Sequence, residues 1–198
     1  MNVGIYIYDK AEVLDFSGPF EVFSTASRVS GSPETFNVFL VSETGNTVSA
    51  RGGFNVNPNY GFLDHPSIDL LIIVGGVHTE EMRKPGVLSW IGKESRKAQI
   101  VASVCTGAFL LAEAGVLSNQ KVTTHWEDIP GLREGYPQLN VLDNQRWVDE
   151  GNIITSGGIS AGIDMSLHLV SKIKNKDLAE KTAKQMEFDW TTNTYKAN

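Results

Sequence analysis

The stretch "IVASVCTGAFLLAEAG" at residues 100–115 decides the fold, because an apolar run typical of a buried strand passes directly into a run typical of a helix. Cys105, the only cysteine among the 198 residues, stands at the junction. The residues two positions before and after it, Ser103 and Gly107, are small, as a nucleophile elbow requires where strand and helix approach closely. The pattern therefore predicts a strand, a sharp turn that presents Cys105, and a helix.

The same alternation of apolar strands and amphipathic helices continues on both sides of this stretch. We expect strands at residues 3–8, 36–42, 68–74, 100–104 and 121–126, a joined pair within 145–158, and a hairpin within 47–62. We expect helices at residues 17–29, 80–98, 106–114, 160–174 and 177–190. Such alternation is typical of an α/β fold with a mostly parallel sheet. No linker divides the chain, so residues 1–198 are expected to form a single domain.

Composition excludes several classes of partner. The net charge of −6 and the pI near 5.2 argue against nucleic acid, which needs a basic face. The longest apolar run, residues 70–74, is too short to span a bilayer. The N-terminus lacks the basic region and cleavage site of a signal peptide, and a single cysteine fits a reducing compartment. We expect a cytoplasmic protein that acts on a small molecule.

Cys105 has two possible roles. A lone cysteine is commonly a small buried residue of the core. At an elbow, however, the following helix aims free N–H groups and a partial positive charge at the sulfur, which would favour the thiolate. We therefore expect Cys105 to be a nucleophile.

Two further features follow predicted strands, and functional sites in such sheets gather at the carboxyl ends of the strands. Asp15 lies in an apolar setting, "VLDF", so its carboxyl is expected to be partly buried with a raised pKa, although it could instead cap a helix that begins at Ser17. Gly75 and Gly76 could bring a backbone N–H to the site as half of an anion hole, or simply make a tight turn.

The segments "VLDFSGP", "SVCTGAFLLAEAGVL", "TTHW" and "GGISAGIDMSLHLV" resemble the PfpI-type proteins of the class I glutamine amidotransferase-like superfamily, and among them the isonitrile hydratases. The resemblance runs from about Val3 to Glu187. It implies a flavodoxin-like sandwich with a mostly parallel central sheet and a nucleophile elbow, commonly as a homodimer. It also places Asp15 beside the nucleophilic Cys105. Thr106 would then orient the carboxyl or the adduct, or be only the first helical residue with an exposed hydroxyl.

The resemblance leads to a hypothesis about chemistry. The terminal carbon of an isonitrile is electrophilic, so Cys105 would attack it while Asp15 supplies a proton, which gives a thioimidate. Asp15 would then activate water, and the adduct would release an N-substituted formamide. This reaction needs no metal or organic cofactor.

Two alternatives remain open. His125 in "TTHW" could act with Cys105 in a small-molecule amidase, glyoxalase or deglycase, although the favoured interpretation is that His125 and Trp126 form a structural box packed under the sheet edge. The third hypothesis is a non-enzymatic redox or stress sensor, or a chaperone, that uses oxidation of Cys105.

Overall fold

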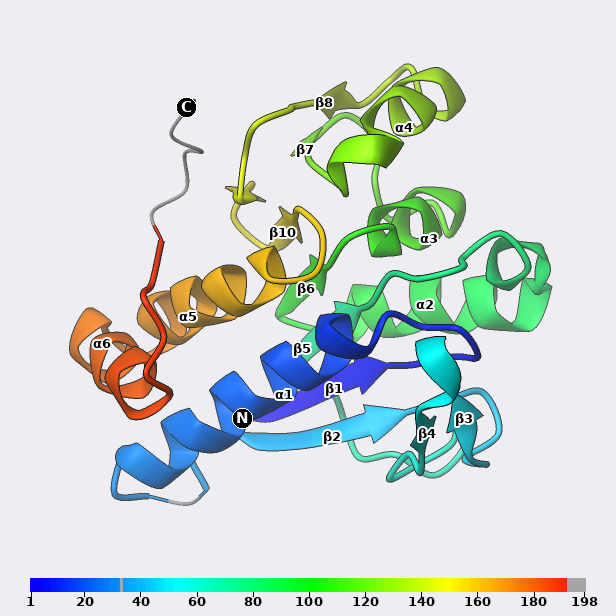
Figure 1. Ribbon diagram of the computed structural model, residues 1–198. Coiled ribbons are helices and arrows are strands. Elements are labelled where there is room, and N and C mark those ends of the chain that lie inside the picture. Colours follow the sequence, from blue (N-terminus) through cyan, green and yellow to red (C-terminus); the bar gives the residue numbers. More distant parts are fainter. Residues whose placement is uncertain (33, 192–198) are drawn as a thin grey trace.

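The computed structural model describes residues 1–32 and 34–191, and at its centre lies a six-stranded sheet in the order β2-β1-β5-β6-β10-β9 (Figure 1). The strands are β1 (Asn2–Tyr6), β2 (Asn37–Val41), β5 (Leu70–Ile73), β6 (Ile100–Ser103), β9 (Trp147–Asp149) and β10 (Ile153–Ser156). All neighbours pair in parallel except β9, which is antiparallel to β10. Counted along the chain, the parallel strands have the flavodoxin-like order 2-1-3-4-5. The predicted fold class is confirmed.

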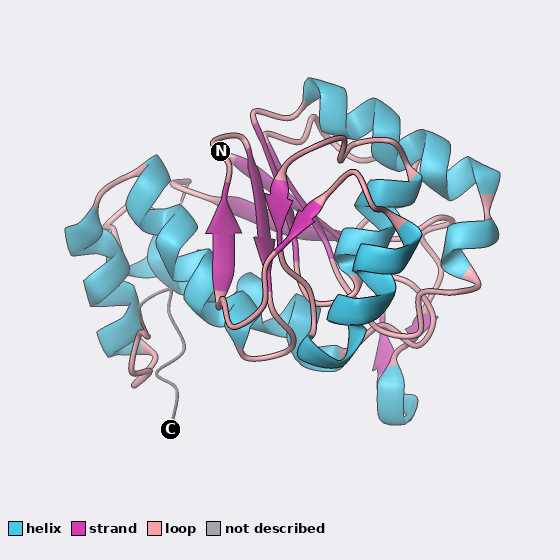
Figure 2. Cartoon of the chain, turned by 90° about the horizontal axis from the view of Figure 1, so that it is seen from above, coloured by secondary structure: helices cyan, strands magenta, loops and turns pink. Residues whose placement is uncertain are grey.

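Helices cover both faces of the sheet, as Figure 2 shows from above. On one face, α1 (Val13–Val29), α5 (Ala161–Ile173) and α6 (Lys176–Gln185) pack against one another. The other face carries α2 (Pro85–Lys97) and α3 (Gly107–Glu113). Because both faces are covered, every residue of β5 and β10 is buried, which explains why β5 is a continuous apolar run; β10 ends in the buried Thr155 and Ser156.

Two small two-stranded sheets and several short helical turns lie outside the central sheet. The predicted hairpin is confirmed as β3 (Val48–Ser49) and β4 (Asn55–Val56), joined through the 3-10 turn η1 (Arg51–Gly53). A parallel pair, β7 (Lys121–Val122) and β8 (Asn140–Val141), flanks α4 (Ile129–Gly135), and sequence reasoning missed both β8 and α4. Two further 3-10 turns are η2 (Glu81–Arg83) and η3 (Trp126–Asp128). None of the helices in the described ranges is long and apolar enough to cross a membrane.

The structure corrects three predicted boundaries. Helix α1 begins at Val13 and not at Ser17, so Asp15 lies in its first turn and Pro19 lies inside the helix. The Ser-Gly-Pro sequence imitates a helix start, whereas Pro19 is the seventh residue of α1, where it removes the hydrogen bond that its N–H would donate to the Asp15 carbonyl. Strand β7 ends at Val122, so His125 follows it in the link to η3 and does not end a strand. Helix α6 ends at Gln185, five residues before the predicted end.

Candidate active site

The residues singled out in the sequence meet at the carboxyl end of the sheet. Asp15 comes from the first turn of α1, which follows β1, and Gly75 and Gly76 follow β5. Cys105 follows β6, and the loop after β10 contributes Ile159. The carboxyl ends of parallel strands share one edge of the sheet, so four loops that are distant in sequence converge there.

Cys105 occupies the turn between β6 and α3 with a φ of +55°, a left-handed conformation that is uncommon for residues other than glycine. Its N–H donates to the Gly157 carbonyl at 3.2 Å, and its carbonyl accepts from Thr124 Oγ1 at 2.8 Å. A Cβ added at Gly107 would lie 2.2 Å from the Ile73 carbonyl oxygen. The requirement for a small residue two positions after the cysteine is therefore confirmed.

The Asp15 carboxyl is fully buried and held at both oxygens. Oδ2 accepts the Gly75 N–H at 3.0 Å, and Oδ1 accepts the Ile159 N–H at 3.1 Å. Burial raises the pKa of Asp15 to about 7, although both N–H donors and a hydrogen bond with Cys105 oppose this rise. The expected buried carboxyl with a raised pKa is confirmed.

Gly75 is the point at which the candidate groups come together. A Cβ there would lie 2.6 Å from Thr106 N, 2.7 Å from Cys105 Cβ and 2.8 Å from Asp15 Oδ2. No side chain fits between these atoms. The glycine thus allows the carboxyl, the thiol and the start of α3 to approach one another.

The Cys105 side chain is a thiol and not a thiolate at neutral pH. Burial, and then the negative charge of Asp15, raise its pKa, while hydrogen bonds from the backbone N–H and the side chain of Thr106 lower it less strongly. The expectation that the helix would favour the thiolate is wrong, because burial and the charge of Asp15 raise the pKa more than the hydrogen bonds from Thr106, at the start of α3, lower it. Ionisation of Cys105 therefore needs a neighbouring base.

Thr106 joins the elbow to the loop after β5. Its hydroxyl accepts the Gly76 N–H at 3.0 Å and donates to the Gly76 carbonyl at 3.1 Å. The N–H groups of Gly75 and Gly76 therefore both donate to side chains of the site, to Asp15 and to Thr106 respectively. Their role as half of an anion hole stays a prediction.

His125 lies beside this cluster, with its ring packed against Gly158, where an added Cβ would lie 2.1 Å from Cδ2. Its Nδ1 is 3.4 Å from Asp128 Oδ2. Within the described ranges, no hydrogen bond joins His125 to Cys105 or Asp15. The neighbouring Trp126 is 74% exposed, so the expectation of a box packed under the sheet edge is wrong for this residue.

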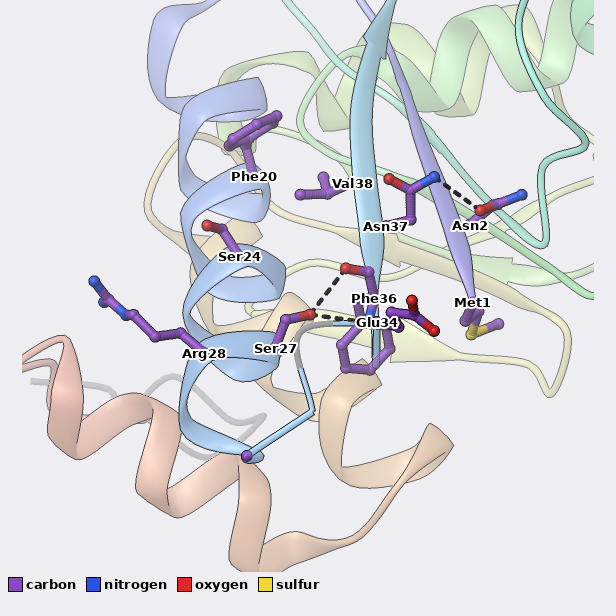
Figure 3. A pocket seen from close by; sticks show the side chains of 11 residues that line it. Met1, Asn2, Phe20, Ser24, Ser27, Arg28, Glu34, Phe36, Asn37 and Val38 are labelled. Carbon is purple, nitrogen blue, oxygen red and sulfur yellow. Dashed lines mark hydrogen bonds between the residues drawn. The ribbon is translucent and has the colours of Figure 1, made fainter.

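Two cavities differ in their relation to the cluster. One of about 900 Å³ lies between α1 and the start of β2, at the amino ends of the strands, where Ser27 Oγ bonds both backbone groups of Phe36 (Figure 3). The other, of about 800 Å³, shares Thr124, Gly157 and Ile159 with the contacts of Cys105 and Asp15. Only the second adjoins the carboxyl ends of the strands, and we call it the site cavity.

Sequence reasoning missed three residues that hold the site: Thr124, Gly157 and Ile159. The Thr124 hydroxyl donates to the Cys105 carbonyl, whereas Gly157 and Ile159 act through a backbone carbonyl and a backbone N–H. Backbone groups leave no residue-type signal. Tyr8 was missed too: its buried hydroxyl donates to the Val74 carbonyl at 3.4 Å, and burial, followed by the charge of Asp15, raises its pKa.

Comparison with known proteins identifies relatives of this chain. The model of the DJ-1/PfpI family matches residues 1–172. An isonitrile hydratase of Pseudomonas putida is 30% identical over 95% of this chain and 78% of its own length. The HTH-type transcriptional regulator CdhR of Pseudomonas aeruginosa is 31% identical over 87% of this chain, which spans 51% of that regulator. The crystal structure of a THiJ/PfpI family protein from Pseudomonas syringae superposes with a TM-score of 0.84 at 24% identity, covering 96% of this chain and 76% of that one, and shows the same fold.

Proposed function

The chain belongs to the DJ-1/PfpI family, and from that premise we propose that it hydrates an isonitrile to an N-substituted formamide. The observation that carries the proposal is the buried pair of Cys105 and Asp15, which approach each other across Gly75: a Cβ there would lie 2.7 Å from Cys105 Cβ and 2.8 Å from Asp15 Oδ2. Burial raises the pKa of the carboxyl to about 7. A nucleophile and a group able to give and take protons are thus adjacent. Similarity to a protein named isonitrile hydratase supports the choice of substrate.

In the first step, the Asp15 carboxylate takes the proton of the Cys105 thiol, and Sγ attacks the terminal carbon of R–N≡C. A C–S bond forms, and the lone pair left on carbon takes the proton back from Asp15. The triple bond becomes a C=N double bond, which gives the thioimidate R–N=CH–S–Cys. Because burial raises the pKa of the thiol, sulfur must lose its proton to the adjacent Asp15 carboxylate as it attacks.

In the second step, Asp15 is a carboxylate again and takes a proton from water while the water oxygen adds to the same carbon. The proton passes to nitrogen. The resulting tetrahedral adduct breaks its C–S bond, releases R–NH–CHO, and leaves the sulfur to recover a proton. The sum is addition of one water to the isonitrile. A carboxyl with a pKa near 7 is matched to both donation and acceptance at neutral pH.

The neighbouring groups would serve this cycle. The N–H groups of Gly75 and Ile159 fix both oxygens of Asp15, so the carboxyl keeps its orientation as it alternates between acid and base. The N–H of Thr106 would stabilise negative charge on sulfur, which develops during attack and again during release.

The experiment is an NMR time course of N-methylformamide production from methyl isocyanide. We expect formamide from the wild-type protein, none above background from Cys105→Ala, and turnover within about threefold of wild type from His125→Ala. The proposal fails if a folded wild-type protein with an alkylatable thiol produces no formamide from any alkyl isocyanide supplied.

A second candidate is hydrolytic chemistry that uses Cys105 with His125. The observation in its favour is that His125 lines the site cavity and lies 3.4 Å from the Asp128 carboxylate, an arrangement that could orient an imidazole base. Assays with a small amide, methylglyoxal and a glycated amino acid separate the two candidates. Hydrolysis that His125→Ala abolishes, without any isonitrile turnover, would favour the second.

A further inference from the structure

Ile159 has a backbone conformation that its side chain disfavours. Its φ is +55°, in the left-handed region, where a β-branched residue is a genuine outlier. This conformation directs the Ile159 N–H to Asp15 Oδ1 at 3.1 Å. Such strain persists only where the surrounding structure imposes it, and it concentrates at functional sites.

The side chain of Ile159 is also unusual, because it is apolar, 39% exposed, and part of the lining of the site cavity. Trp126, which is 74% exposed, lines the same cavity, together with Ile129 and Pro130. Neighbouring exposed apolar side chains in a concave site are typical of a surface that binds an apolar group.

Polar residues line the rest of the cavity, among them Ser160, which follows Ile159, and residues 123–125, which precede Trp126. Residues 143–145 contribute an aspartate, an asparagine and a glutamine, and Arg133 donates to the Val141 carbonyl at 2.8 Å. Of all the lining residues, Ile159 is the one whose backbone is bonded to the Asp15 carboxyl. The residue that links the cavity lining directly to the acid/base group therefore contributes an aliphatic side chain to that lining.

The shape of an isonitrile connects these observations. The free molecule is linear as it approaches, with its terminal carbon toward the sulfur of Cys105 and its N-substituent pointing away, and it becomes bent at carbon and nitrogen once the C–S bond forms. The site cavity adjoins the cluster through Thr124, Gly157 and Ile159, so it is the space in which we place the substituent, beside Ile159. We propose that Ile159 is the specificity-determining residue of the site, which holds Asp15 through its N–H and selects a bulky hydrocarbon N-substituent through its side chain. This inference rests on the proposed function.

The test compares methyl isocyanide with cyclohexyl isocyanide for wild type, Ile159→Val and Ile159→Ala. Leu63→Ala is the control, because Leu63 is a fully exposed aliphatic residue outside the cavity lining. We expect Ile159→Ala to lower kcat/KM for the cyclohexyl substrate about tenfold, mainly through KM, and to change it less than twofold for the methyl substrate. Ile159→Val should retain most of the preference. The pH profile of kcat should not move, since all three residues keep the N–H.

A second readout separates this inference from the proposed function. N-methylmaleimide and N-cyclohexylmaleimide carry the same two substituents as the isocyanides, and they alkylate Cys105 without a hydration step. Mass spectrometry measures the rate of alkylation by each. If wild type turns over no isonitrile, the proposed function fails, yet a cyclohexyl-to-methyl rate ratio that falls in Ile159→Ala still supports the role of Ile159. A ratio unchanged in both assays overturns the inference. So does a thiol that reacts with neither maleimide, because the cavity would then not lead to Cys105.

Discussion

Two turns that connect a strand to a helix build the site, and they use the same strained conformation for different purposes. Cys105, between β6 and α3, and Ile159, between β10 and α5, both have a φ of +55°. The first turn brings a buried thiol to Asp15, whereas the second brings a backbone N–H to the same carboxyl. Cys105 acts through its side chain and is recognisable from a sequence motif, whereas Ile159 acts through its backbone and is not. A strained turn can thus contribute to an active site without a residue type that identifies it in the sequence.

The largest expected effect concerns Asp15, where the two turns meet. Asp15→Asn keeps the size of the side chain but removes its acid/base function, so kcat for hydration should fall about 10³-fold. NMR assays of formamide production measure this change. The control is Glu12→Gln, which neutralises a nearby carboxylate paired with Arg51 and should stay within about threefold of wild type. Retention of more than a tenth of the activity by Asp15→Asn would show that another group moves the protons.

The next effect is on stability. The pKa of Asp15 is about 7 in the folded protein against 3.8 for an unperturbed aspartate, so between these values the folded state binds a proton that the unfolded state has lost. The free energy of unfolding should therefore fall as pH rises from about 4 to about 7, by about 4 kcal/mol in total at most. Urea denaturation across this range, with Asp15→Asn as the reference, isolates the contribution. Equal slopes in both proteins would contradict the raised pKa.

These two turns also show what the sequence could and could not predict. The elbow at Cys105 was predictable because strand, small flanking residues and helix are all written in adjacent residues. The buried carboxyl of Asp15 was predictable from its apolar neighbours. The parallel sheet followed from apolar strands such as β5, since burial on both faces removes the alternation of polar and apolar residues.

The sequence-based predictions that failed did so for one of two reasons. Either a misleading local sequence pattern was present, or the feature depends on contacts between distant segments. The Ser-Gly-Pro sequence at residues 17–19 is typical of a helix start, whereas the start observed at Val13 has no side-chain cap hydrogen bond to mark it. The thiol pKa was misjudged because the burial of Cys105 beside Asp15 arises only when β1 and β6 lie in one sheet. The bond from Ile159 to Asp15 spans 144 residues and involves a backbone N–H, so no local pattern could reveal it.

A third prediction contrasts the packing of the two turns. Gly107→Ala places a Cβ 2.2 Å from the Ile73 carbonyl oxygen, a fixed backbone atom, and should destabilise the protein by about 3 kcal/mol. Gly157→Ala, just after β10, meets its nearest atoms at 3.5 Å and should cost less than about 1 kcal/mol. Chemical denaturation of both variants provides the comparison. Similar losses would mean that the second turn is packed as tightly as the elbow.

The smallest effect tests whether the two turns share the same strain. At a φ of +55° glycine is favoured over alanine, so Cys105→Gly should be more stable than Cys105→Ala, and Ile159→Gly more stable than Ile159→Ala, each by about 1 kcal/mol. Ser24, exposed inside α1, supplies a control with the opposite sign, because Ser24→Gly should be about 1 kcal/mol less stable than Ser24→Ala. Denaturation midpoints of the six variants give the three differences. If the glycine variant at position 159 is less stable than the alanine variant, as at position 24, the backbone of Ile159 is not held in the left-handed region in solution. The N–H of Ile159 would then be free to leave Asp15, and only the turn at Cys105 would keep the left-handed conformation.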